Sequence, residues 1–129
     1  MAGELEAVIR GMFDGLDRND LEAMTKAFAD DAQGVDEISR HWMRGRDELN
    51  AYVGGLLTMV EDVSSELHDV RETTLDRTGI LTCWLEQDYT LGGERHHISA
   101  PTTAVFRHDD DGWKMVLFHS IPLPPGEES

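Results

Sequence analysis

The sequence predicts an α+β fold in which three helices come first and pack on one face of an antiparallel sheet. Apolar residues recur with the helical period of about 3.6 residues up to Val60, and with the strand period of two from Ser64 onward. The 129 residues, 40% of them hydrophobic, suffice for one domain with a single core and are too few for two.

The first two helices are predicted by apolar stripes. A second, shorter helix follows the first, with Asn19 as its N-cap, Glu22 three residues later and Phe28 in its apolar stripe. The stripe of the first helix consists of Leu5, Val8, Ile9, Met12, Phe13 and Leu16.

The third helix is predicted to begin near Arg46 and to run to Val60. Asp47 and Glu48 lie in its first turn, where negative charge complements the helix dipole. Gly54 and Gly55 inside the helix each cost about 1 kcal/mol relative to alanine, which indicates that another element packs close to this backbone.

Four segments rich in β-branched and aromatic residues are predicted as strands, near 65–76, 80–91, 95–108 and 113–121. Short turns rich in Gly and Asp join them as antiparallel neighbours, and a short extended piece, 35–38, precedes the third helix. Pro101 within a long strand favours curvature. A curved sheet closed by helices makes a cone-shaped barrel with an interior, formed by a single domain over 1–122, while 123–129 reads as a Pro-rich acidic tail.

The composition excludes partners that carry negative charge. Eleven Lys and Arg against 26 Asp and Glu give a formal charge of −15, which repels nucleic acid and anionic membrane surfaces. The longest nearly uncharged stretch, 51–60, is far shorter than the roughly 20 apolar residues that span a bilayer. The N-terminus lacks the pattern of a signal peptide, and the single Cys83 has no partner for an intramolecular disulfide. We therefore expect a soluble, cytoplasmic protein.

Short motifs at 19–24, 28–32, 44–49, 111–116 and His119–Ser120 span most of the chain. In this order, they resemble the SnoaL-like branch of the nuclear-transport-factor-2-like superfamily. The resemblance implies a cystatin-like cone with a cavity between the helices and the concave sheet, and a homodimer formed by sheet faces. The superfamily includes ketosteroid isomerases, polyketide cyclases and dehydratases as well as assembly modules, so the fold does not imply one function.

The resemblance to ketosteroid isomerases nominates catalytic residues. It puts Asp36 at the position of the general base, and Met12 where those enzymes have a tyrosine that donates to the oxyanion. Methionine cannot donate a hydrogen bond, so Tyr52, His97 or Trp42 would have to supply the donor. An apolar cavity would raise the pKa of Asp36 and suit it to take a proton next to a carbonyl. The alternative for Asp36 is a solvated loop carboxylate.

His119 is a second catalytic candidate, as a general acid or base. Regular alternation along its strand puts it on one face with Trp113, Met115 and Leu117. The alternative is a histidine that is satisfied in the core or at a dimer interface.

Further candidates for substrate binding lie on the predicted strands. Trp84 and Glu86 share one strand face opposite an apolar face, and parity alone leaves open which face lines the cavity. His97 and Thr103 share a face of the next strand, whereas Trp42 precedes the third helix as an aromatic for the cavity mouth or for the core. The adjacent His96 and His97 point to opposite faces and cannot chelate one ion, so no metal site is expected.

The sequence therefore predicts a cofactor-free protein that binds a small, mostly apolar, cyclic or carbonyl-bearing molecule. If it is an enzyme, proton abstraction next to a carbonyl would drive isomerisation, cyclisation or dehydration, with Asp36 as base and His119 or Tyr52 as donor. The alternative is a non-catalytic module for oligomerisation or ligand sensing.

Overall fold

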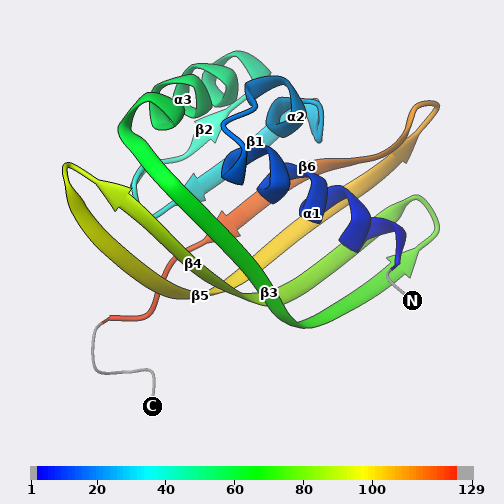
Figure 1. Cartoon of the computed structure of the whole chain (residues 1–129). Coiled ribbons are helices and arrows are strands. Elements are labelled where there is room, and N and C mark those ends of the chain that lie inside the picture. The colour runs from blue at the N-terminus through cyan, green and yellow to red at the C-terminus, as the bar shows by residue number, and fades with distance from the viewer. Residues whose placement is uncertain (1–2, 125–129) are drawn as a thin grey trace.

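A computed structural model describes residues 3–124 and contains three helices and six strands. The order along the chain confirms the α+β class (Figure 1). The elements are α1 (Glu4–Asp17), α2 (Leu21–Thr25), β1 (Phe28–Asp36), β2 (Met43–Arg44), α3 (Arg46–Met59), β3 (Val60–Leu75), β4 (Thr78–Leu91), β5 (Glu94–Asp109) and β6 (Gly112–Ser120).

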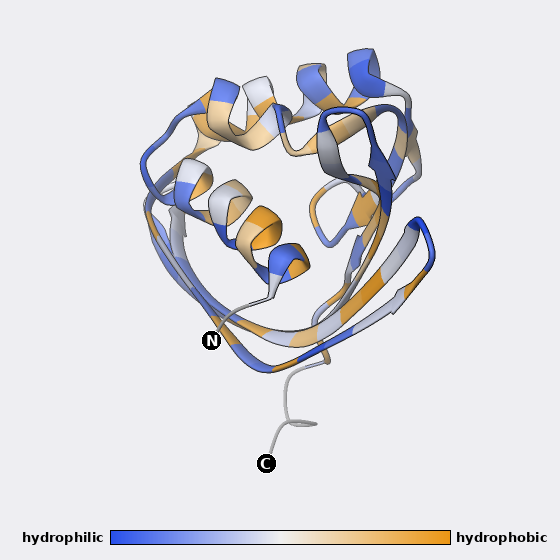
Figure 2. Ribbon diagram, turned by 90° about the vertical axis from the view of Figure 1, so that its right-hand side faces the viewer, coloured by the Kyte–Doolittle hydropathy of each residue, from blue (hydrophilic) through white to orange (hydrophobic). Residues whose placement is uncertain are grey.

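All six strands form one sheet in the order β2-β1-β6-β5-β4-β3. Every neighbouring pair is antiparallel except β1 and β6, which run parallel. The sheet curves around the helices, which lie together on its concave side (Figure 2). The four strands after α3 are antiparallel neighbours, as the sequence predicts, whereas β1 comes before α3 and enters the sheet beside the last strand, parallel to it.

The apolar stripe of α1 is the centre of the core. Leu5 and Ile9 are 1% and 0% exposed, and the helix lies across the concave face of the sheet (Figure 1). The cap of α2 differs from the prediction: the Asp20 side chain accepts a hydrogen bond from the Ala23 N–H at 3.1 Å. Asn19 has a left-handed backbone, with φ 58°, and donates instead to the Leu57 carbonyl at 2.9 Å.

The second helix is shorter, and the strand after it longer, than the sequence predicts. The helix ends at Thr25, and Phe28 begins β1 instead of continuing the helical stripe. This strand finds hydrogen-bonding partners on both sides, β2 and β6, which an extended backbone needs when it is buried. The tertiary pairing thus decides between two local structures that the apolar pattern allows.

The alternation of β6 is interrupted by a bulge. Phe106 pairs with Met115, but the adjacent Val105 pairs with Leu117, so Val116 is an extra residue in β6. Such a bulge shifts the alternation by one residue. Met115 is therefore buried before the bulge, and Phe118 and Ser120 face inward after it.

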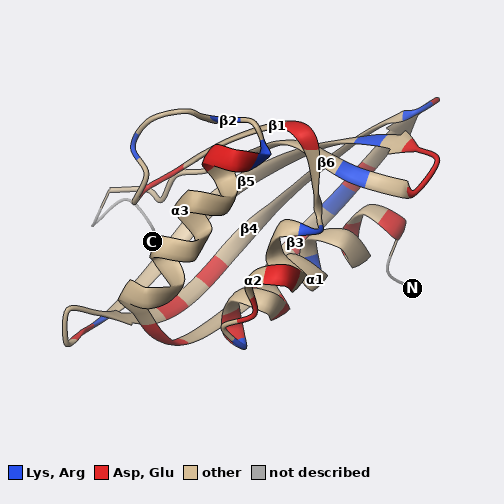
Figure 3. Ribbon diagram, turned by 90° about the horizontal axis from the view of Figure 1, so that it is seen from above, with Lys and Arg blue, Asp and Glu red and all other residues tan. Residues whose placement is uncertain are grey.

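Helix α3 closes one side of the cone. Its acidic residues are confined to the first turn, and the rest of the helix is uncharged (Figure 3). The space beside Gly54 and Gly55 is open, because a Cβ atom built on either residue meets nothing within 4 Å. The expected close packing against these glycines is therefore wrong. Within residues 3–124, no helix has both the length and the apolar character to cross a membrane.

Candidate functional site

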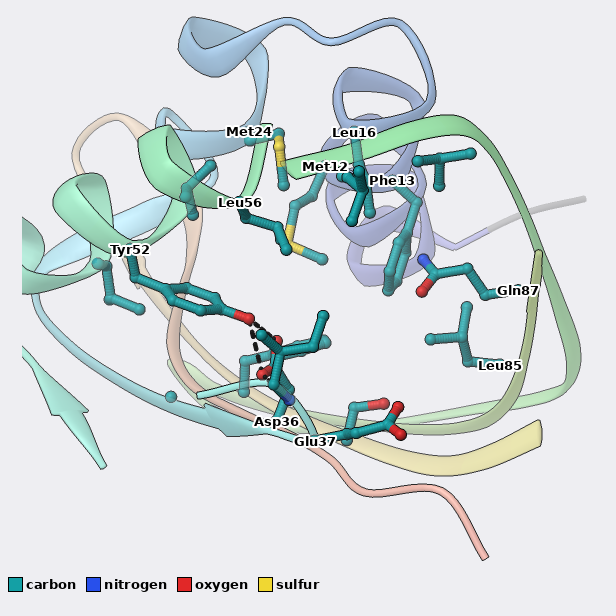
Figure 4. Close-up of a pocket in the computed structure, with 18 of the residues that line it drawn as sticks. Met12, Phe13, Leu16, Met24, Asp36, Glu37, Tyr52, Leu56, Leu85 and Gln87 are labelled. Carbon is teal, nitrogen blue, oxygen red and sulfur yellow. Dashed lines mark hydrogen bonds between the residues drawn. The ribbon is translucent and has the colours of Figure 1, made fainter. Parts of the chain in front are cut away.

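A pocket opens between the helices and the concave face of the sheet. The free space inside it is about 90 Å³. One water molecule needs roughly 10–15 Å³ when free space is measured in the same way, so the pocket has room for a small organic molecule. The lining is mostly apolar and includes Met12, Phe13, Leu56 and Leu85 (Figure 4). Among the lining residues, Asp36, Glu37, Tyr52, Gln87, Tyr89 and Ser120 carry polar groups in their side chains.

One wall of the pocket carries a carboxylate and a phenol in direct contact. Asp36 ends β1 and Tyr52 lies in the middle of α3, so strand and helix bring them together across the mouth of the cone. The Tyr52 hydroxyl lies 2.8 Å from both carboxylate oxygens of Asp36 and shares its proton between them (Figure 4). Burial raises the pKa of Tyr52, and the negative charge of Asp36 raises it further. Tyr52 therefore stays protonated and acts as a hydrogen-bond donor.

The two oxygens of Asp36 differ in their surroundings. Oδ1 also accepts hydrogen bonds from the backbone N–H groups of Ile38 at 3.0 Å and Ser39 at 2.8 Å. Within the described part of the chain, the shared Tyr52 proton is the only hydrogen bond that Oδ2 accepts. The turn after β1 thus holds the carboxylate in place through Oδ1 and leaves lone pairs of Oδ2 for a ligand.

The opposite wall carries a second polar group, Gln87 on β4, which is 9% exposed. Its amide lies across the pocket from Tyr52 (Figure 4). Tyr89, two residues along the same strand, has its pKa raised by burial and then by the nearby charges of Glu37 and Asp36. The pocket therefore combines apolar walls with polar groups at two separate places.

The structure answers the question of which face of β4 lines the pocket. Leu81, Cys83 and Leu85 point inward and are at most 5% exposed. Trp84 and Glu86 therefore lie on the outer face of the sheet, the face turned away from the helices. Cross-strand pairing puts His97 and Thr103 there as well, because Asp88 pairs with His97 and Thr82 with Thr103. None of these four residues lines the pocket, which corrects their predicted role in the cavity.

His119 and Trp42 also lie outside the pocket. The bulge at Val116 turns His119 to the exposed outer face, since its neighbours Phe118 and Ser120 face inward. Trp42 is 43% exposed because the adjacent Met43 takes the inward position in β2, and the Arg44 guanidinium lies over its ring. Neither residue can donate to a ligand beside Asp36, so of the proposed donors only Tyr52 is in reach.

Met12, in contrast, is 4% exposed and lines the pocket as an apolar residue.

The sequence analysis missed Gln87 as a pocket residue, although the alternation of the strand indicates its inward position. Gln87 continues the inward series of Leu81, Cys83 and Leu85, where a polar side chain in an apolar alternation points to a specific contact.

On the outer face, His97 lies between two carboxylates. Its Nδ1 is 2.9 Å from Asp88 Oδ1 and its Nε2 is 3.1 Å from Glu86 Oε1, while the Ser99 hydroxyl donates to the other Glu86 oxygen. These hydrogen bonds, that of Asp88 first, raise the pKa of His97. Within residues 3–124, no three His, Cys, Asp or Glu side chains are grouped so that they could hold a metal ion.

The fold and the pocket together define the class: an α+β cone with a mostly apolar interior. The chain belongs to the SnoaL-like domain family, whose sequence profile matches residues 5–124. No curated protein matches the chain.

Solved structures support the same fold. A ketosteroid isomerase-like protein from Erwinia carotovora atroseptica is similar with a TM-score of 0.79 at 19% identity, over 93% of this chain and 94% of that one. A cystatin-like protein from Caulobacter vibrioides gives 0.81 at 20% identity, over 94% and 88%. An NTF2-like protein from Novosphingobium aromaticivorans gives 0.78 at 17%, over 96% and 82%. At these identities the likeness establishes the fold.

Proposed function

We propose that this protein binds a small, mostly apolar, carbonyl-bearing molecule in its cone and catalyses proton transfer next to the carbonyl. The observation that carries this proposal is the contact between Asp36 and Tyr52 at the wall of an otherwise apolar pocket. An apolar environment strengthens the hydrogen bond from the phenol to an oxygen that gains negative charge. Isomerisation, cyclisation and dehydration all begin with such a step.

Asp36 is the base and Tyr52 the donor. Asp36 Oδ2 takes the proton from the carbon next to the carbonyl, and the electron pair of the broken C–H bond moves to the carbonyl oxygen as an enolate. Once Asp36 is protonated, it accepts less strongly from Tyr52, whose hydroxyl then donates to the enolate oxygen. The raised pKa of Tyr52 keeps its proton on the phenol during this step. Asp36 returns the proton to the substrate to complete an isomerisation.

A test of this proposal follows deuterium exchange at the carbon next to the carbonyl of cyclic ketones, by NMR in D₂O. We expect Asp36→Asn to lower the rate about 100-fold or more, in line with the usual contribution of a positioned base. Asp110→Asn, the same substitution in an exposed turn outside the pocket, is the matched control and should exchange at the wild-type rate.

Unchanged exchange in folded Asp36→Asn would refute the role of Asp36. Ketone binding without exchange in the wild-type protein would instead favour the non-catalytic, ligand-sensing alternative. Circular dichroism of both variants establishes that they are folded.

We also propose that the protein is a homodimer that pairs through the outer face of the sheet. Ile80 and Trp84 on this face of β4 are 37% and 36% exposed, which leaves apolar side chains available for contact with another molecule. A second copy of the same face would cover them.

A cytoplasmic setting remains a prediction, which the single buried Cys83 supports. The domain boundary at residue 122 also remains a prediction, since 125–129 lie outside the described residues.

A further inference from the structure

Gln87 is a buried polar residue that the proposed proton transfer does not use. It lies on the inward face of β4 and lines the pocket on the wall opposite Tyr52 (Figure 4). The side chain has one acceptor, Oε1, and one donor group, Nε2. The ligand must carry a donor if Oε1 faces it and an acceptor if Nε2 faces it. The neighbouring residues determine which of the two atoms does.

The orientation of the Gln87 amide follows from a chain of hydrogen bonds that starts on α1. The Asp17 carboxylate accepts from the Ser65 hydroxyl at 2.8 Å and from the Ser65 N–H at 3.2 Å. Because the Ser65 proton is used for Asp17, its oxygen can only accept from Gln87, whose Nε2 lies 3.0 Å away. The reverse orientation would put two acceptors in contact. Asp17 thus fixes the Gln87 amide through Ser65.

Asp17 holds this orientation as long as it is ionised. Burial raises its pKa, and the hydrogen bonds from Ser65 oppose that rise. The carboxylate is held by two donors of one residue and lies at the end of α1, behind Ser65 as seen from Gln87. It therefore contributes orientation to the site rather than a charge that contacts the ligand.

With Nε2 directed to Ser65, Oε1 is the atom that remains for a ligand. Within residues 3–124, no group donates a hydrogen bond to this oxygen, which is not fully buried and belongs to a residue that lines the pocket. We propose that Gln87 Oε1 selects ligands that carry a hydroxyl group at the end remote from the carbonyl that Asp36 and Tyr52 bind. This inference rests on the proposed function and specifies its substrate class: small hydroxylated ketones.

A hydroxyl fits this position better than an ammonium group. The walls beside Gln87 are apolar, with Phe13 and Leu85 among them (Figure 4). A neutral hydroxyl needs one acceptor when it is buried, whereas an ammonium group would bring a charge and three donors into this wall. A purely apolar ligand is also disfavoured, because it would remove water from Gln87 Oε1 and offer this oxygen no hydrogen bond in return.

The test compares ketones that differ only in this group. Isothermal titration calorimetry measures the binding of 3- and 4-hydroxyacetophenone against 3- and 4-methylacetophenone, since a methyl group is close to a hydroxyl in size. We expect one hydroxylated isomer to bind the wild-type protein about tenfold more tightly than its methyl partner. Gln87→Met keeps the length of the side chain without the amide and should remove the preference, and Ser65→Ala, which releases the amide, should reduce it.

The outcomes separate this inference from the proposed function. If the ketones bind but the hydroxyl brings no preference, or if folded Gln87→Met retains the preference, the role of Gln87 is refuted while the pocket keeps its proposed ligand class. If no ketone binds the wild-type protein, both proposals fail. Should Gln87→Met not fold, an undiminished preference in Ser65→Ala refutes the proposed orientation.

Discussion

At the scale of single residues, neighbours decide what each titratable group can do. Asp36 is held by a phenol and two backbone N–H groups and keeps one oxygen accessible to a ligand. Cys83 points into the core, where burial raises the pKa of its thiol to about 11, so it stays protonated and unreactive near neutral pH. His97 has the opposite surroundings: it is exposed and bonded to two carboxylates.

The surroundings of His97 predict its titration. We expect NMR to give His97 a pKa above the ordinary value of 6.5, and Asp88→Asn to lower it more than Glu86→Gln, because the hydrogen bond to Asp88 is the larger cause. A raised pKa in the folded state means that the protonated histidine stabilises the fold fully below pH 6.5 and loses this effect as the pH rises through the folded-state pKa. Solvent screening keeps the effect small. A His97 pKa at or below 6.5 would contradict the observed contacts.

At the scale of elements, departures from regular periodicity set the composition of the site. The extra residue Val116 turns His119 away from the pocket and brings Ser120 into it. Pairing of β1 with β6 draws Phe28 out of the predicted helix and carries Asp36 to the mouth of the cone. Both effects come from hydrogen bonds between segments that lie far apart in the sequence.

The glycines of α3 permit a test of packing at this scale. Because a Cβ on exposed Gly55 meets nothing within 4 Å, Gly55→Ala should stabilise the protein by about 1 kcal/mol through the higher helix propensity of alanine. Gly15→Ala in α1 is the control and should bring no such gain in stability, since a Cβ there lies 3.0 Å from the Met24 backbone nitrogen. Urea unfolding followed by tryptophan fluorescence measures both. A less stable Gly55→Ala variant would show that something packs against α3 after all.

At the scale of the whole molecule, the curved sheet has two faces with different surroundings. Its concave face and the helices enclose the pocket (Figure 2). Its outer face carries exposed Ile80 and Trp84, and the charged network around His97 begins two residues after Trp84, at Glu86. The strand residues that were candidates for the cavity lie on this outer face. We propose that the face contacts a second copy of the chain and takes no part in catalysis.

The proposed homodimer predicts a dimer mass by size-exclusion chromatography with light scattering. Trp84→Glu would bury a charge in the interface and should shift the protein to the monomer, because a buried unpaired charge is strongly unfavourable. Leu21→Glu, at an exposed apolar residue of α2 on the other side of the sheet, is a control that should remain dimeric. A monomeric wild-type protein, or a Trp84→Glu variant that still dimerises, would refute pairing through this face.

The order of the helices and of the four strands after them, and the curvature of the sheet, follow from local patterns in the sequence. Periodicity, capping and turn residues act over a few positions, so they can be read without the fold. Short motifs led to the resemblance to the SnoaL-like family, and that resemblance led to Asp36, which ends β1 and lines the pocket.

Only the tertiary structure decided which candidates share the pocket. Strand parity left both faces of β4 open until packing against α1 turned Leu81 and Leu85 inward and Glu86 outward. The contact between Asp36 and Tyr52, and the chain from Asp17 to Gln87, join residues from different elements that no local pattern relates. Local periodicity determines the elements, whereas long-range pairing, one bulge and core packing determine which side chains meet.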